Sequence, residues 1–156
     1  MSIKFGILLF VLICFSCVSS ESSKQTEFAL ASARGDYASV KQLFESGNIK
    51  IDAINGKIGP ALVSASYGGH KEIVQFLLDN GANINIRDEK GTTPLMNAVI
   101  GEKTEIVKIL LERGADPNLY VVNEKGEKTE VTAMTFAKMK EKKEIIDLLE
   151  QRLQQR

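Results

Sequence analysis

The sequence predicts an all-α repeat solenoid, which is a row of stacked helical units. Two segments, Pro60 to Asn85 and Thr93 to Asn118, align without a gap at an offset of 33 residues. Each contains a short apolar stretch, a central turn and a longer amphipathic stretch, the pattern of a helix–turn–helix unit. A unit of this size cannot bury its apolar face alone, so neighbouring units must stack to form the core.

The composition excludes several classes of protein. With 156 residues, 44% of them hydrophobic, the chain can bury a core and is not wholly disordered. Its 20 basic and 20 acidic residues give a formal charge of zero, which removes the general electrostatic attraction to nucleic acid. We therefore expect no nucleic-acid partner. One His and two Cys leave little material for a zinc site, a thiol enzyme or a disulfide scaffold.

The first 20 residues have the pattern of an export signal. Lys4 precedes an apolar run from Phe5 to Phe15, which is shorter than the roughly 20 residues that a transmembrane helix needs. A charged start, an apolar middle and a small polar exit predict a signal peptide over residues 1–20. We expect the Ser-rich residues 18–25 to form a polar tether.

The exit of this segment allows two interpretations. Phe15-Ser16-Cys17 resembles a loose bacterial lipobox, in which Cys17 is the lipidation site and the only link to a membrane. Val18-Ser19-Ser20 instead has small residues suited to signal-peptidase cleavage and free secretion. Under both interpretations the protein is exported, either as a membrane-anchored lipoprotein or as a periplasmic or secreted protein.

The first unit, over residues 26–58, is a weaker copy of the second, over residues 59–91. The two match at an offset of 34 residues, so one residue is inserted between the copies. Asn55-Gly56 is a tight-turn dipeptide within this longer connection. The matching positions of the first unit are Phe28, Ala31, Gly35, Val40, Leu43, Phe44 and Gly47.

The second and third units carry helix signals. Ile73, Phe76 and Leu77 recur at spacings i, i+3 and i+4, which gives the longer helix of the second unit one apolar face. Thr93-Pro94 predicts a helix start in the third unit, with Thr as N-cap and Pro at the first helical position.

The connection between the third unit (92–128) and the fourth (129–156) is six residues longer than the others. Within it, residues 120–122 and 128–131 are predicted to pair as an extended hairpin. The last helix, over about residues 142–155, carries polar residues on its outer side, as a terminal unit without a neighbour requires.

These motifs together resemble the ankyrin repeat family. Thr93-Pro94-Leu95 fits the family's opening helix, and Gly69-His70 fits the Gly-His between its two helices. The ending Leu-Leu-x-x-Gly-Ala occurs twice, before residues 83 and 116. The resemblance covers residues 26–156 as about four repeats, one with an elongated finger, and is typical of a bacterial-type exported ankyrin repeat protein.

The resemblance implies a non-catalytic scaffold that binds a partner protein through hairpin fingers and the concave face of its first helices. We expect that the protein has no cofactor and that it is a monomer. For the long finger, a partner-binding role and a tolerated insertion both remain open, as do binding and repeat packing for Tyr67 and Ile100. The candidate binding residues are Asn55, Lys57, Tyr67, Glu89, Lys90, Thr92, Ile100, Tyr120, Val122, Lys125 and Met139.

The sequence contains no convincing catalytic or metal-binding pattern, so we expect no enzyme. His70 is the only imidazole, and its position implies a structural role at the turn between helices. The basic run over residues 138–143 is interrupted by Glu141 and indicates a solvated face of the last unit. A role in the bacterial cell envelope or periplasm is expected, with two alternatives: a secreted effector that binds host proteins, or an immunity or inhibitor protein.

Overall fold

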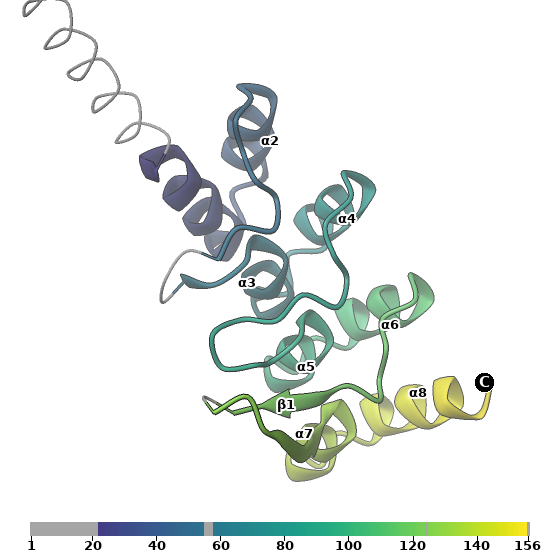
Figure 1. Ribbon diagram of the computed structural model, residues 1–156. Coiled ribbons are helices and arrows are strands. Elements are labelled where there is room, and N and C mark those ends of the chain that lie inside the picture. Colours follow the sequence, from purple (N-terminus) through teal and green to yellow (C-terminus); the bar gives the residue numbers. More distant parts are fainter. Residues whose placement is uncertain (1–21, 55–57, 124, 156) are drawn as a thin grey trace, which may run out of the picture.

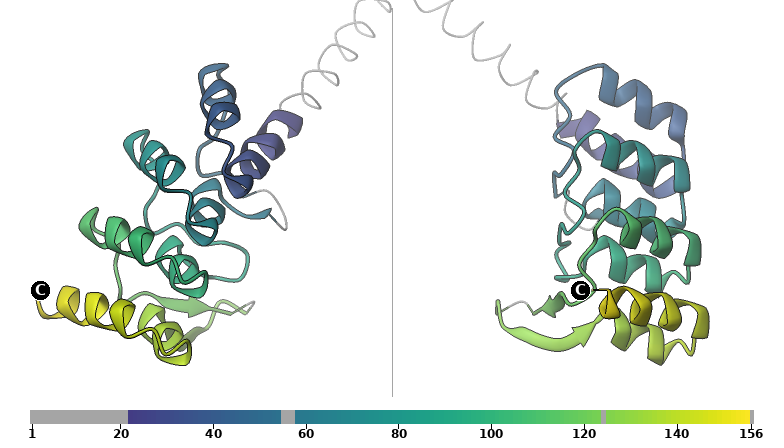
Figure 2. Two further views of the ribbon diagram at one scale, coloured as in Figure 1. Left: turned by 180° about the vertical axis from the view of Figure 1, so that it is seen from behind. Right: turned by 90° about the vertical axis from the view of Figure 1, so that its right-hand side faces the viewer.

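The protein is a row of antiparallel helix pairs, as shown by a computed structural model that describes residues 22–54, 58–123 and 125–155. The first helices of the pairs form one layer and the second helices form another (Figure 1). Seen from the side, the pairs stack as rungs and the connecting segments project along one edge (Figure 2). This architecture confirms the predicted all-α repeat solenoid.

Each helix pair consists of a first and a second helix, and a finger connects it to the next pair. None of the helices in the described ranges is long and apolar enough to cross a membrane. The first helices span residues 22–34, α3 (Ala61–Gly68), α5 (Pro94–Ile100) and α7 (Ala133–Met139). The second helices are α2 (Tyr37–Glu45), α4 (Lys71–Asp79), α6 (Thr104–Glu112) and α8 (Lys143–Gln154).

The expected tether over residues 18–25 is wrong for its last four residues, because residues 22–25 belong to the first helix. The Thr26 hydroxyl donates to the Ser22 carbonyl at 2.9 Å within that helix. The Gln25 amide group exchanges two hydrogen bonds of 2.9 Å with the backbone of Lys50. The side chain of Gln25 therefore ties this turn to the first finger, a contact that the sequence pattern does not reveal.

One continuous apolar core runs through the stacked pairs. It extends from Phe28 in the first pair to Leu149 in the last, and both side chains are fully buried. In α4, Ile73 and Leu77 are buried and Phe76 packs partly buried against the core, as the predicted apolar face requires. Each pair thus completes the core of its neighbours, as expected of a repeat solenoid.

The start of α5 has the predicted capping geometry. The Thr93 hydroxyl accepts a hydrogen bond from the Met96 amide at 3.4 Å, and Pro94 occupies the first turn. Thr93 has an extended backbone, as an N-cap residue typically does.

The turns between the two helices of a pair require a left-handed backbone, which Gly69 adopts with a φ of 83°. The equivalent residues of the next two pairs are Glu102 and Glu141, with φ values of 58° and 53°. Residues with a Cβ atom pay a steric cost in this conformation. The third and fourth pairs therefore keep the backbone shape of the turn without its usual glycine.

The elongated connection forms the predicted hairpin. Strand β1 (Tyr120–Val122) pairs antiparallel with β2 (Lys128–Thr132), and the register places Tyr120 opposite Thr132. The turn is closed by the Asn123 side chain, whose oxygen accepts from the amides of Lys125 (3.0 Å) and Glu127 (2.9 Å). We call residues 120–132 the long finger.

Candidate partner-binding surface

A groove of about 670 Å³ lies between the first helices and the fingers of the central pairs. Tyr67 at the end of α3 and Ile100 at the end of α5 contribute side chains to it. The opposite wall is the central finger, residues 87–92, which supplies Glu89 and Lys90. The fold thus brings five of the predicted residues together here: Tyr67, Glu89, Lys90, Thr92 and Ile100.

An apolar row follows the ends of the first helices: Tyr67 and Ile100 line the groove, whereas Met139 is not among its lining residues. Tyr67 is 54% exposed, Ile100 is half-buried, and Met139 at the equivalent position of α7 is 75% exposed. Ala33 is the equivalent residue of the first helix and also lines the groove. Large apolar side chains are normally withdrawn from water when a neighbouring unit can cover them. Their exposure in one row indicates a surface suited to a partner.

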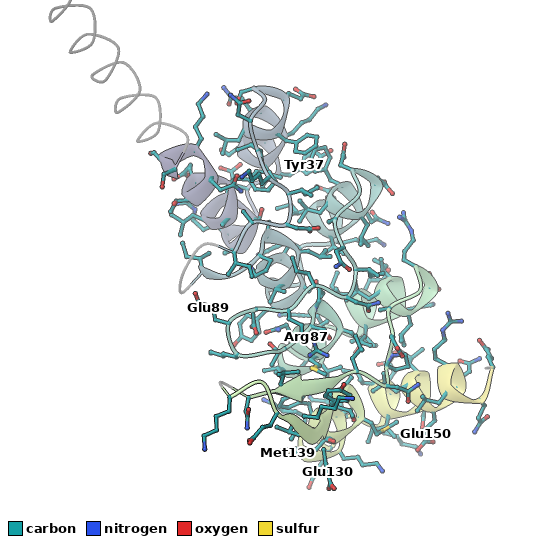
Figure 3. The ribbon with its side chains drawn as sticks, viewed as in Figure 1. Tyr37, Arg87, Glu89, Glu130, Met139 and Glu150 are labelled. Atoms are coloured by element: carbon teal, nitrogen blue, oxygen red, sulfur yellow. The ribbon has the colours of Figure 1, made fainter. Side chains whose placement is uncertain are left out.

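The central finger is organised by one carboxylate. Asp88 accepts hydrogen bonds from the backbone amides of Lys90 (3.0 Å) and Thr92 (2.8 Å). It also accepts from the Thr92 hydroxyl at 2.7 Å. Three donors on one carboxylate hold the loop in a single shape, in which Glu89 and Lys90 are exposed at the tip. Figure 3 shows Glu89 there.

Thr92, a predicted binding residue, is buried at the base of the central finger. Only 7% of Thr92 is exposed, and its hydroxyl oxygen accepts from the Asn97 amide at 2.6 Å while donating to Asp88. Thr92 therefore connects the finger to α5 and leaves no polar group for a partner. Asn97, which we did not predict as a binding residue, lines the groove beside Thr92. It aligns at the offset of 33 with Ser64, a second polar residue of the groove, and this shared position could have identified it.

The long finger lies against the central finger. Arg87 donates from one guanidinium nitrogen to the Gly91 carbonyl at 2.7 Å and to the Tyr120 carbonyl at 2.6 Å. Gly91 has a φ of 73°, and a Cβ atom there would collide with the backbone nitrogen and oxygen of Val122. This close approach requires glycine and fixes β1 beside residue 91.

Tyr120 and Val122 of the long finger make contacts within the chain. The Tyr120 ring is half-buried, with the Lys128 ammonium 4.8 Å and the Arg87 guanidinium 5.7 Å from its centre. Such cation–π contacts hold the ring on its own chain. Val122 is half-buried as well, whereas Lys125 at the turn is exposed.

Ion pairs link the turn between α5 and α6 to the turn between α7 and α8. Lys142 lies 2.8 Å and Lys140 3.5 Å from the Glu102 carboxylate, which joins the third pair to the fourth. The hydrogen bond and charge of Lys142, with a smaller contribution from Lys140, lower the pKa of Glu102.

In the first two pairs, the His70 ring donates to the Ala33 carbonyl at 3.1 Å, which supports its structural role.

Several predicted features lie outside the described residues: Asn55 and Lys57 of the first finger, Cys17, and the signal peptide over residues 1–20. Within the described ranges, no group of three His, Cys, Asp or Glu side chains is placed to hold a metal ion.

Comparisons with known proteins give a consistent result. A family model of ankyrin repeats in three copies matches residues 28–121, more than half of the chain. Ankyrin repeat domain-containing protein 29 of Danio rerio is 40% identical over 59 residues, which are 38% of this chain and 20% of that protein. Ankyrin repeat domain-containing protein 17 of Homo sapiens is 59% identical over 34 residues, 22% of this chain and 1% of that protein. The chain therefore spans a fifth or less of the length of these curated relatives.

Proposed function

This chain belongs to the ankyrin repeat family, whose repeats form protein–protein interaction domains, and we propose that it is a non-catalytic scaffold that binds a partner protein in the groove. The observation that carries the proposal is the exposure of Tyr67 beside Ile100 in a cavity of about 670 Å³. Aromatic side chains are enriched among the residues that dominate interface energies. An exposed tyrosine in a rigid groove offers such a contact at little cost in side-chain entropy.

The two walls of the groove differ in chemical character and contribute differently to recognition. Tyr67 and Ile100 provide apolar area, while the tip of the central finger provides the charges of Glu89 and Lys90. Burial of the apolar row supplies affinity, and the charged tip selects among partners because a mismatched charge is costly to bury. The bonds of Asp88 keep this tip in place before binding, which reduces the ordering cost of association.

Site-specific photocrosslinking tests this proposal in the living cell. A photoreactive amino acid at position 100 is expected to give one discrete adduct with a partner protein. The same amino acid at position 147, an exposed site on α8, is the matched control and should give none. Adducts from position 147 with the same protein, or none from position 100, would contradict groove binding.

We propose in addition that the scaffold acts after export, in the bacterial envelope or periplasm. The support is the charged start and the apolar run from Phe5 to Phe15 in the sequence. Palmitate labelling of the wild type and of Cys17→Ala distinguishes a lipid anchor from free secretion. Label present in the wild type and absent from the variant supports the anchor. Label that persists in the variant, or never appears, rules it out.

A further inference from the structure

Two ion pairs join the second helices of the central repeats. The Lys71 ammonium on α4 lies 2.8 Å from the Glu105 carboxylate on α6. Near the other ends of these helices, the Arg113 guanidinium lies 2.8 Å from the Asp79 carboxylate. In each pair one repeat supplies the cation and its neighbour supplies the anion, so the seam between α4 and α6 is charge-matched.

The preceding seam, between α2 and α4, has carboxylates at the positions of Glu105 and Asp79. It has no basic residue at the positions of Lys71 and Arg113. The repeat offset of 34 places Tyr37 where the next repeat has Lys71, and both residues begin their helices. The offset of 33 places Glu72 at the position of Glu105, and Asn80 at the position of Arg113. Within the described part of the chain, Glu72 forms no ion pair, and Tyr37 stands at the helix position that Lys71 has in the next seam.

The same seam has a cavity that is open to solvent and lined mainly by α4. About 550 Å³ of space is lined by Tyr37, Glu72, Gln75, Phe76, Asp79 and Asn80. The Tyr37 ring packs edge-on against Phe76 with centroids 5.8 Å apart, and Phe76 packs in the same manner against Phe44 at 5.4 Å. These contacts hold Tyr37 between α2 and α4, with 36% of its surface exposed (Figure 3).

An aromatic ring and a carboxylate on the walls of one cavity suit a cationic group. The ring attracts a cation through its quadrupole, and the carboxylate pairs with it. We propose that the cavity between α2 and α4 binds an arginine side chain of a partner protein. The guanidinium takes the place that Lys71 occupies in the next seam, and it suits a ring better than an ammonium does because it is planar and weakly hydrated.

The seam between α6 and α8 has the carboxylate of this arrangement but lacks its aromatic ring. There the equivalent positions are Thr104 and Glu144, so the carboxylate has no aromatic neighbour at the start of the helix. The α2–α4 cavity is also formed by second helices, whereas the groove is formed by first helices and fingers. The arginine site therefore goes beyond the proposed function, and either can fail without the other.

A titration of the full chain with a blocked Gly-Arg-Gly peptide tests the site, with the citrulline peptide as a neutral probe of nearly equal shape. Amide shifts in two-dimensional NMR are expected at residues 37, 72 and 76, with an affinity on the order of tenfold higher for the arginine peptide. Glu72→Gln should reduce the affinity for the arginine peptide to that for citrulline. Glu144→Gln, the matched control, should leave it unchanged.

Tyr37→Lys provides a second variant, in which the chain's own cation replaces the ring of the site. It supplies the missing cation and should form the pair with Glu72 that Lys71 forms with Glu105. The expected result is loss of arginine-peptide binding without a fall in the midpoint of thermal unfolding. Three results would overturn the proposal: equal binding of the citrulline peptide, shifts confined to the groove, or undiminished binding by Tyr37→Lys.

Discussion

The Arg87 guanidinium donates a hydrogen bond of 2.6 Å to the Tyr120 carbonyl and lies 5.7 Å from the centre of the Tyr120 ring. This contact joins the central finger to the long finger, across 33 residues of sequence. Figure 3 shows Arg87 beside the strand that carries the contact. The long finger therefore packs against the central finger.

Arg87→Ala is expected to release the long finger while the helices remain folded. The variant leaves the carbonyls of Gly91 and Tyr120 without their charged donor, which should lower the free energy of unfolding by about 2 kcal/mol. Hydrogen exchange should accelerate at residues 120–122 and 128–132 more than in α4. Arg113→Ala removes only an exposed ion pair and is the control. Equal acceleration throughout the chain would contradict the local role of Arg87.

Gly91→Ala should be more damaging than the same change at Gly81, although both residues have positive φ. At Gly81 an added Cβ atom meets open space, so we expect only the backbone cost of about 1 kcal/mol. At Gly91 the added atom meets the Val122 backbone, which should raise the total loss to about 2–4 kcal/mol. Denaturant unfolding of both variants measures the difference. Equal losses would show that the two fingers separate freely.

Glu141→Gly is expected to stabilise the protein by about 0.5–1 kcal/mol. The left-handed backbone of Glu141 is costly for a residue with a Cβ atom, and the cost exceeds the extra chain entropy of glycine. Glu150→Gly, at an exposed site within α8, is the matched control and should destabilise by about 1 kcal/mol. Destabilisation by Glu141→Gly, measured by denaturant unfolding, would mean that this side chain makes a compensating contact.

The Lys71–Glu105 pair should make stability depend on pH. The hydrogen bond and charge of Lys71 hold the pKa of Glu105 below its ordinary value of 4.5. Because the folded-state pKa is the lower one, the pair stabilises the fold above about pH 4.5. This stabilisation is lost as the pH falls through the folded-state value.

Thermal unfolding of the wild type and of Glu105→Gln measures this effect. The variant should have the lower midpoint at neutral pH, and the difference should disappear in acid and shrink in high salt. On the alkaline side, Glu105 raises the pKa of Lys71 above 10.5, so the difference should also fade above that range. A difference that is constant with pH would exclude the charge interaction as its cause.

The sequence predicts the repeated parts of the molecule because the period itself carries the information. Offsets of 33 and 34 align residues that become equivalent in space, and the predicted hairpin follows from two arms, 120–122 and 128–131, on either side of a polar turn. One contact between successive fingers repeats, because the Asp116 amide donates to the Asn85 side chain as the Asn83 amide donates to the Asp52 side chain. The contact of Arg87 does not repeat, because Ile54 stands at the equivalent position of the first finger. For this reason the burial of Thr92, the position of Tyr120 beneath Arg87 and the helical state of residues 22–25 could not be read from the pattern.

The groove residues were predictable in part. Tyr67, Ile100 and Met139 share one repeat position, and the first two of these residues line the groove. Their exposure depends on how closely consecutive first helices approach. Gly101 permits that approach, since a Cβ atom there would collide with the Tyr67 carbonyl. Such packing distances are tertiary properties, which a single sequence does not report.

The central claim is that the apolar row of the groove holds the partner. Its most direct test is the affinity of the partner cross-linked at position 100 for the wild type and for Tyr67→Ser/Ile100→Ser, measured by calorimetry. We expect the double variant to bind on the order of a hundredfold more weakly with an unchanged helical circular dichroism spectrum. Leu153→Ser, which alters an exposed apolar residue on α8, should bind as the wild type does. Unchanged affinity of the folded double variant would contradict the claim.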